Sequence, residues 1–208
     1  MNLDDPSLTP DVRNVLERAF RCQGNTFSSV IHMTEGDLTD WVEALEGGVF
    51  RQTKGLLLRS NDPKPLRGDE TTPVDPGYCC LGVLCHLEKQ RGLLNLLAYA
   101  KGGSWAYASL QDTSRLYSTY LPAYTAQRYR CSQEGMAFNK VQLEGMALPE
   151  EIQRRVFAPT DTGLVAGWVT LSVLNDAGVP FSDIAKLLRK YVVVVKDYES
   201  YEILRVGL

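Results

Sequence analysis

The residues best suited to chemistry in this chain are crowded into one short run, from Tyr78 to Leu87. The run holds three of the five cysteines and one of the two histidines of the chain. Cysteine thiolates and histidine imidazoles bind zinc, and they also act as nucleophiles and bases in enzymes. The first question is therefore whether their spacing allows a metal site or a catalytic pair.

The spacing favours neither. A zinc site needs about four ligands within tetrahedral reach, and the chain has no Cys-x-x-Cys motif. On a helix, Cys79 and His86 would share a face but lie roughly 10 Å apart along the axis, too far for one ion. Cys85 and His86 are neighbours that diverge by about 100° around a helix, so they do not pair. We predict no metal and no cofactor here, and reduced, buried cysteines that act as small hydrophobic side chains.

Two further interpretations stay open. The fold could bring His32 to Cys79 or Cys85, which would make a cysteine-dependent hydrolase or transferase. Metal or redox chemistry would need further ligands from distant parts of the chain. The chain has no Gly-x-Ser-x-Gly, no phosphate-binding loop, no Gly-x-Gly-x-x-Gly and no His-Glu-x-x-His motif. Their absence favours a protein that is not an enzyme.

The elements around this run predict a helix-rich α+β fold in a single domain, residues 1–208, with a small hairpin or sheet. Apolar residues spaced three and four apart predict helices over 10–20, 37–46, 79–90, 149–156 and 180–191, and apolar runs suggest two more over 93–100 and 168–177. Four consecutive valines, 192–195, predict a buried strand with 198–206 as a partner. Residues 49–59 read as a hairpin around Thr53-Lys54-Gly55, and 60–77, with four prolines, as a mobile loop or insertion.

The cysteine run itself is predicted to be a core helix. Its buried stripe consists of Cys80, Val83, Leu84 and Leu87. A glycine inside a helix costs about 1 kcal/mol and is usually kept for close approach, so we expect Gly82 to face a closely packed neighbour.

Composition excludes two classes of partner. Apolar residues make up 44% and charged residues 23% of the 208 residues, as in ordinary soluble proteins. A net charge of −3 argues against binding to genomic nucleic acid or to a membrane surface. There is no apolar run of membrane-spanning length and no export signal at the N-terminus. We therefore expect a cytoplasmic protein with reduced thiols.

Two segments in the middle of this acidic chain are basic. Five basic residues lie between Gly47 and Gly68 against one acidic residue, and six lie between Lys89 and Gln133 against one. The second segment also carries seven tyrosines and tryptophans. Arginine forks onto phosphate, and aromatic rings stack on bases. The residues predicted to bind a small anionic, nucleotide-type ligand are Arg51, Lys54, Trp105, Arg115, Tyr117, Tyr120, Tyr124, Arg128 and Arg130.

The same composition is also compatible with two surfaces of a different kind. A solvated basic face with tyrosines at the edge of the core would need no ligand at all. A protein-binding surface fits equally well, because tyrosine, tryptophan and arginine dominate the energetics of protein interfaces.

Two blocks of the chain resemble a family of uncharacterised proteins encoded by bacteriophages. The first block comprises Trp41, Ala44-Leu45, Gln52, Gly55, Leu57 and the run Tyr78-Cys79-Cys80-Leu81-Gly82-Val83-Leu84-Cys85. The second comprises Leu174-Asn175-Asp176, Gly178, Phe181 and Ile184-Ala185. The chain departs from the family pattern at His86, where an acidic residue is common.

The resemblance implies a phage-encoded protein in the cytoplasm of an infected bacterium. Small accessory phage proteins often interfere with host defence, some by sequestering signalling nucleotides, usually as homo-oligomers. The leading hypothesis is therefore a non-enzymatic protein that sequesters a small anionic, nucleotide-type immune signal. The alternatives are an inhibitor that binds a host defence protein directly and a cysteine-dependent hydrolase or transferase.

Overall fold

The computed structural model describes residues 3, 5–21, 29–60, 73–99, 104–157 and 167–208. Within these ranges, eight helices hold 41% of the residues and strands in four small sheets hold 20%, which confirms the α+β prediction with helices predominating. The helices are α1 (Pro10–Arg21), α2 (Glu35–Glu46), α3 (Cys80–Gln90), α4 (Ala123–Arg128), α5 (Lys140–Leu143), α6 (Glu150–Phe157), α7 (Leu171–Asp176) and α8 (Phe181–Tyr191). The strands are β1 (His32–Thr34), β2 (Arg51–Gln52), β3 (Leu58–Arg59), β4 (Gly77–Tyr78), β5 (Leu94–Tyr99), β6 (Ser104–Ser109), β7 (Ala137–Phe138), β8 (Val169–Thr170), β9 (Val193–Val195) and β10 (Ile203–Val206).

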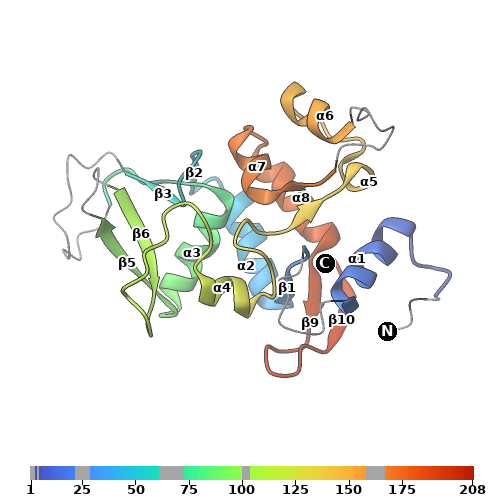
Figure 1. Ribbon diagram of the computed structural model, residues 1–208, viewed down its shortest axis with the longest axis horizontal. Coiled ribbons are helices and arrows are strands. Elements are labelled where there is room, and N and C mark those ends of the chain that lie inside the picture. Colours follow the sequence, from blue (N-terminus) through green and yellow to red (C-terminus); the bar gives the residue numbers. More distant parts are fainter. Residues whose placement is uncertain (1–2, 4, 22–28, 61–72, 100–103, 158–166) are drawn as a thin grey trace.

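Figure 1 shows the helices α2, α3, α7 and α8 in the middle of an elongated molecule. The two-stranded ribbon of β5 and β6 forms one end. Helix α1 lies at the other end, beside β10 and the C-terminus. One hydrophobic cluster runs through the central helices and reaches both ends.

The sheet β1-β9-β10 is built around the predicted valine strand. All three residues of β9 are buried. Strand β1 pairs with it in parallel and β10 in antiparallel orientation, with a register shift between Ile203 and Arg205. Helix α8 leads directly into β9 and packs against α2. The predicted helices over 10–20, 37–46, 149–156 and 180–191 are confirmed, with boundaries within two residues.

The predicted hairpin over 49–59 and the predicted helix over 93–100 are both wrong. In each case the backbone pairs with a strand that the local sequence pattern does not reveal. Strands β2 and β3 do not form a hairpin, since β4 lies between them, parallel to β2 and antiparallel to β3. The apolar segment 93–100 is not a helix, because Leu94 to Tyr99 pairs along its whole length with Ser104 to Ser109. Most of the predicted loop 60–77 lies outside the described residues, and Gly77 at its end belongs to β4.

Helix α7 is shorter than the predicted 168–177, because Val169-Thr170 forms β8. Its predicted glycine stop is confirmed. Gly178 has φ +90°, its N–H donates to Asn175 O, and the Val179 N–H donates to Leu174 O. These two bonds satisfy carbonyls that would otherwise be left open at the helix end.

His32 makes the stability of the fold depend on pH. It lies in β1 and is 2% exposed. Burial and then the nearby charge of Arg130 lower its pKa from 6.5 to about 4. Between these two values the unfolded chain binds the proton and the folded protein does not, so stability is lost as the pH falls.

We expect the free energy of unfolding to drop by about 2 kcal/mol from about pH 7 to about pH 5 on account of His32. Urea titrations at both pH values measure the drop. The variant His32→Gln, which cannot titrate, should lose much less over the same interval. An equal drop in both proteins would show that other groups cause it.

Candidate functional site

The cysteine run forms helix α3, with Cys79 as its N-cap. The Cys79 Sγ accepts the Gly82 N–H at 3.3 Å. Cys80, Val83 and Leu84 are completely buried, as predicted, whereas Leu87 is only partly buried at the edge of the core. The run is thus the central core helix.

Gly82 has the close neighbour that its place in the helix predicts. A Cβ at Gly82 would lie 1.6 Å from the carbonyl oxygen of Leu57. That carbonyl accepts the Cys79 N–H at 3.3 Å, and the Leu57 N–H donates to Ser118 O at 2.7 Å. The backbone before β3 therefore lies directly on the first turn of α3.

Asn175 links helix α7 to the start of α3 and to the segment after β2. Its side chain is completely buried in α7. Its Oδ1 accepts the Cys80 N–H and the Gln52 side-chain amide, both at 3.1 Å, and its Nδ2 donates to Thr53 O at 2.8 Å. Trp41 adds a hydrogen bond from its Nε1 to Cys80 O. Asn175 and Trp41 thus hold α2, α3, α7 and the β2–β3 turn together.

The thiols of Cys79, Cys80, Cys85 and Cys131 are unsuited to nucleophilic catalysis. Burial raises the pKa of Cys79 to about 11 and that of Cys131 to about 12. It raises the pKa values of Cys80 and Cys85 well above the usual range. A nucleophilic cysteine needs the opposite shift, because the thiolate is the reactive form. Among the described residues, no group of three His, Cys, Asp or Glu side chains is placed to hold a metal ion.

We expect these four cysteines to resist alkylation in the folded protein. Iodoacetamide at about pH 8 should label them only as fast as the chain unfolds, because the buried thiols remain protonated. Mass spectrometry of peptides after timed labelling measures each site. Protein unfolded in guanidinium is the control and should be labelled at every cysteine. Rapid labelling of Cys79 or Cys85 in the folded state would reopen the cysteine-enzyme interpretation.

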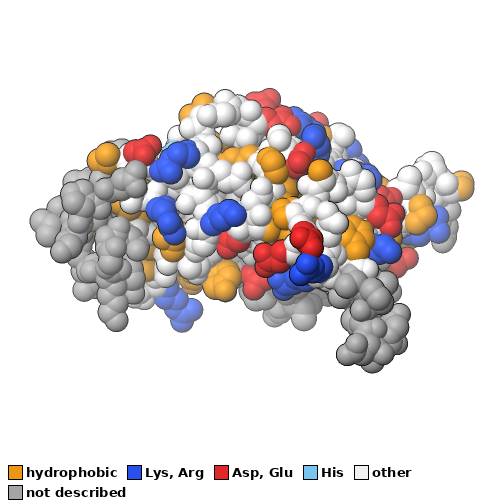
Figure 2. Space-filling view, turned by 90° about the horizontal axis from the view of Figure 1, so that it is seen from above, with side chains coloured by type: hydrophobic (Ala, Val, Ile, Leu, Met, Phe, Trp, Pro, Cys, Tyr) orange, Lys and Arg blue, Asp and Glu red, His pale blue; other side chains and the backbone are white. Residues whose placement is uncertain are grey.

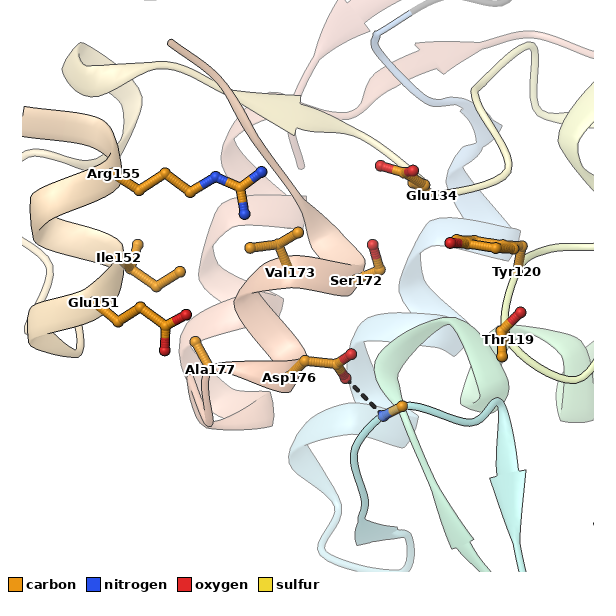
Figure 3. Close-up of a pocket in the computed structure, with 11 residues that line it drawn as sticks. Thr119, Tyr120, Glu134, Glu151, Ile152, Arg155, Ser172, Val173, Asp176 and Ala177 are labelled. Atoms are coloured by element: carbon orange, nitrogen blue, oxygen red, sulfur yellow. Dashed lines mark hydrogen bonds between the residues drawn. The ribbon is translucent and has the colours of Figure 1, made fainter. Parts of the chain in front are cut away.

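A pocket of about 440 Å³ lies beside this network, where α6 and α7 meet the β2–β3 turn and the loops before α4 and after it. Figure 3 shows Arg155 extending from α6 toward the centre, with Glu134 and Tyr120 on the opposite wall. Asp176 forms part of the floor, and its Oδ1 accepts the Gly55 N–H at 2.9 Å. The side chains that line it are Thr119, Tyr120, Glu134, Glu151, Ile152, Arg155, Ser172, Val173, Asp176 and Ala177.

The lining combines three kinds of polar group with one aromatic ring. Three carboxylates and one arginine give it a net negative charge, and three hydroxyl groups lie among them. Tyr120 is 49% exposed, so its ring is available to a ligand. Such a pocket suits a ligand with several hydrogen-bond donors, a planar group and at most one strongly anionic group.

The structure does not bring the nine predicted ligand residues together. Trp105 is 1% exposed and belongs to the core. Arg51 pairs with Asp75, with its Nη2 2.7 Å from the Asp75 carbonyl oxygen. Lys54 is exposed and lies against Gly178. Neither of the two basic side chains lines the pocket, although Lys54 adjoins Gly55, which does.

Arg128 and Arg130 are used inside the fold. Arg128 stacks 4.2 Å over the ring of Tyr198 and lies 3.6 Å from Asp37 and 3.7 Å from the buried Glu88. Arg130 stacks 3.5 Å over the ring of Tyr201. These contacts join α4 and the turn after it to α2, α3 and the segment before β10. Both arginines, which were expected to bind phosphate, therefore make contacts that stabilise the fold.

Four of the predicted residues line a cavity. Arg115, Tyr117 and Tyr124 line a separate hollow of about 170 Å³. Tyr120 lines the larger pocket. On the face in Figure 2, basic side chains are scattered and interspersed with acidic ones, so no single basic patch forms there.

Sequence reasoning missed most of the larger pocket. Asp176 lies in the second block of the resemblance, but the sequence around it does not indicate that its carboxylate lines a pocket. Glu151 and Arg155 lie four residues apart in α6, so helical spacing puts them on one side. The predicted ligand residues came from acid-poor segments, whereas three of the four charged side chains of this pocket are acidic.

No helix in the described part of the chain has the length and apolar character needed to cross a membrane. No protein-family model, no curated protein and no solved structure matches this chain.

Proposed function

We propose that this protein binds a nucleoside-type ligand with at most one phosphate group in the pocket between α6 and α7, and that it captures the ligand without converting it. The main support is that Tyr120, Arg155 and three carboxylates line one pocket. Its volume of about 440 Å³ falls within the range typical of small-molecule sites.

Each wall offers a partner for one part of such a ligand. The Tyr120 ring supplies a stacking surface for a base. Glu134 and Asp176 can accept hydrogen bonds from ribose hydroxyls, a role that carboxylates have in dinucleotide-binding folds. Arg155 can pair with a phosphate through two parallel hydrogen bonds. The three carboxylates would repel a polyphosphate. The anionic ligand expected from the sequence is therefore restricted to one with at most one phosphate group.

Capture rather than conversion is supported by the chemistry of the described residues. The thiols that could act as nucleophiles are buried in the core and have raised pKa values. The resemblance to phage-encoded proteins supports a setting in the cytoplasm of an infected bacterium. Capture of a host signalling nucleotide there would weaken a defence response.

Calorimetric titration with adenosine, AMP and ATP tests the proposal. We expect adenosine and AMP to bind and ATP to bind more weakly than AMP. Arg155→Ala should weaken AMP binding by about tenfold or more, because a charge-assisted hydrogen bond is lost, and should leave adenosine nearly unchanged.

Arg154→Ala is the matched control. Arg154 is the neighbouring arginine of α6, it is 76% exposed, and it pairs with Glu150 instead of lining the pocket. It should bind both ligands like the wild type. Equal AMP affinity in the Arg155→Ala variant, or no binding of adenosine or AMP at about 10 mM, would exclude this pocket as the site.

A further inference from the structure

The hollow lined by Arg115, Tyr117 and Tyr124 is separate from the pocket between α6 and α7. Its walls come from the end of β6, the loop that follows and α4, and its other lining side chains are Ser109, Asp112, Ala123 and Gln127. Only the loop between Tyr117 and Tyr120 contributes to both cavities, with Tyr117 on one and Thr119-Tyr120 on the other. The two cavities share no lining residue.

Two walls of this hollow, at Tyr117 and at α4, are held by hydrogen bonds to buried residues. Tyr117 exchanges two backbone hydrogen bonds, at 2.8 and 2.9 Å, with Tyr107, which is completely buried in β6. Helix α4, which carries Tyr124, is anchored from beneath by a hydrogen bond from Thr125 to the buried Glu88. A cavity with fixed walls loses little conformational entropy on binding.

Arg115 provides the positive charge of the hollow. Its side chain is 74% exposed, and its ion pair with Asp112 spans 3.6 Å. Asp112 also accepts hydrogen bonds from the backbone and hydroxyl groups of Ser114, and these bonds lower its pKa. The guanidinium can therefore turn to an arriving anion while the aspartate stays bound within its own turn.

We propose that this hollow is a second ligand site, which takes a single aromatic ring bearing one anionic group. Its volume of about 170 Å³ leaves room for one aromatic ring. Tyr117 and Tyr124 offer their rings to the ligand ring, and Arg115 pairs with a carboxylate or phosphate. Its charged lining, one arginine and one aspartate, differs from the three carboxylates and one arginine of the larger pocket, so we expect its ligand to differ in class.

Titration followed by ligand-observed NMR with benzoate, phenyl phosphate, benzyl alcohol and inorganic phosphate tests this assignment. We expect benzoate and phenyl phosphate to bind, whereas benzyl alcohol and inorganic phosphate, which each lack one half of the recognition, should bind at least about tenfold more weakly. The preferred anion of the first pair distinguishes an aromatic carboxylate from a phosphate ester.

Arg115→Gln should weaken both aromatic anions by about tenfold or more. Arg59→Gln, which removes an exposed arginine of β3 outside both cavities, should change nothing. Arg155→Ala should also leave this binding intact, so this inference and the proposed function fail independently. Absence of binding at about 10 mM, or unchanged affinity in Arg115→Gln, would overturn the second site.

Discussion

Replacing Gly82 by alanine is expected to destabilise the protein by more than about 4 kcal/mol, enough to leave little folded material. In an unhindered helix the same change would stabilise by about 1 kcal/mol, because glycine is the poorer helix former. Here the added methyl group would lie 1.6 Å from the Leu57 carbonyl oxygen. The Cys79 N–H holds that carbonyl in place, so relief of the clash would separate α3 from the segment before β3.

Gly36→Ala is the matched control for this prediction. Gly36 also lies inside a helix, α2, but a Cβ there would meet no atom within 4 Å. It should raise the free energy of unfolding by up to about 1 kcal/mol. Urea denaturation followed by circular dichroism measures both variants. A Gly82→Ala protein as stable as the wild type would contradict the close contact of α3 with Leu57.

Replacing Asn175 by alanine is expected to cost about 3–5 kcal/mol, because the buried Cys80 N–H and two partly buried groups lose hydrogen bonds at once. The Cys80 N–H would lose its acceptor and the Thr53 carbonyl its donor, and the Gln52 amide would keep only its bond to the Val179 carbonyl oxygen. Each buried group left without a partner costs about 1–3 kcal/mol. The effect should spread to the pocket, since Asp176 follows Asn175 directly and holds Gly55.

Asn139→Ala supplies the comparison. Asn139 caps the short helix α5 through a bond to the Gln142 N–H at 3.1 Å, and it is only partly buried. Loss of a cap costs about 1 kcal/mol. Guanidinium denaturation of both variants should therefore separate a network residue from an ordinary cap. Similar losses in the two variants would show that Asn175 does not organise the network.

The sequence correctly predicted the elements in which the spacing of apolar residues is enough to distinguish a helix from a strand. Helices α2 and α8, the valine strand β9 and the core helix α3 follow from spacing alone, and even the crowding at Gly82 could be inferred. The ribbon of β5 and β6 could not, because an apolar octapeptide that starts with Leu93 is compatible with a helix until its partner strand is known. The position of β4 between β2 and β3 likewise depends on a segment far away in the chain.

The candidate pocket was less predictable than the fold. Its lining comes from five separate segments, so no window of sequence contains it. Residue type alone suggested that Arg128 and Arg130 bind phosphate. In the structure they stack on Tyr198 and Tyr201, which lie near the end of the chain. Of the nine predicted residues, Tyr120 lines the larger pocket and three others line the smaller hollow.

Recovery of the bound ligand shows directly whether the protein captures it without converting it. The protein is incubated with substoichiometric adenosine or AMP and filtered, and the retained fraction is denatured and analysed by mass spectrometry. We expect the ligand to disappear from the filtrate and to return unaltered in full on denaturation. AMP should stay in the filtrate with Arg155→Ala but not with Arg154→Ala. A chemically altered product, or AMP retention equal in both variants, would contradict capture in the pocket between α6 and α7.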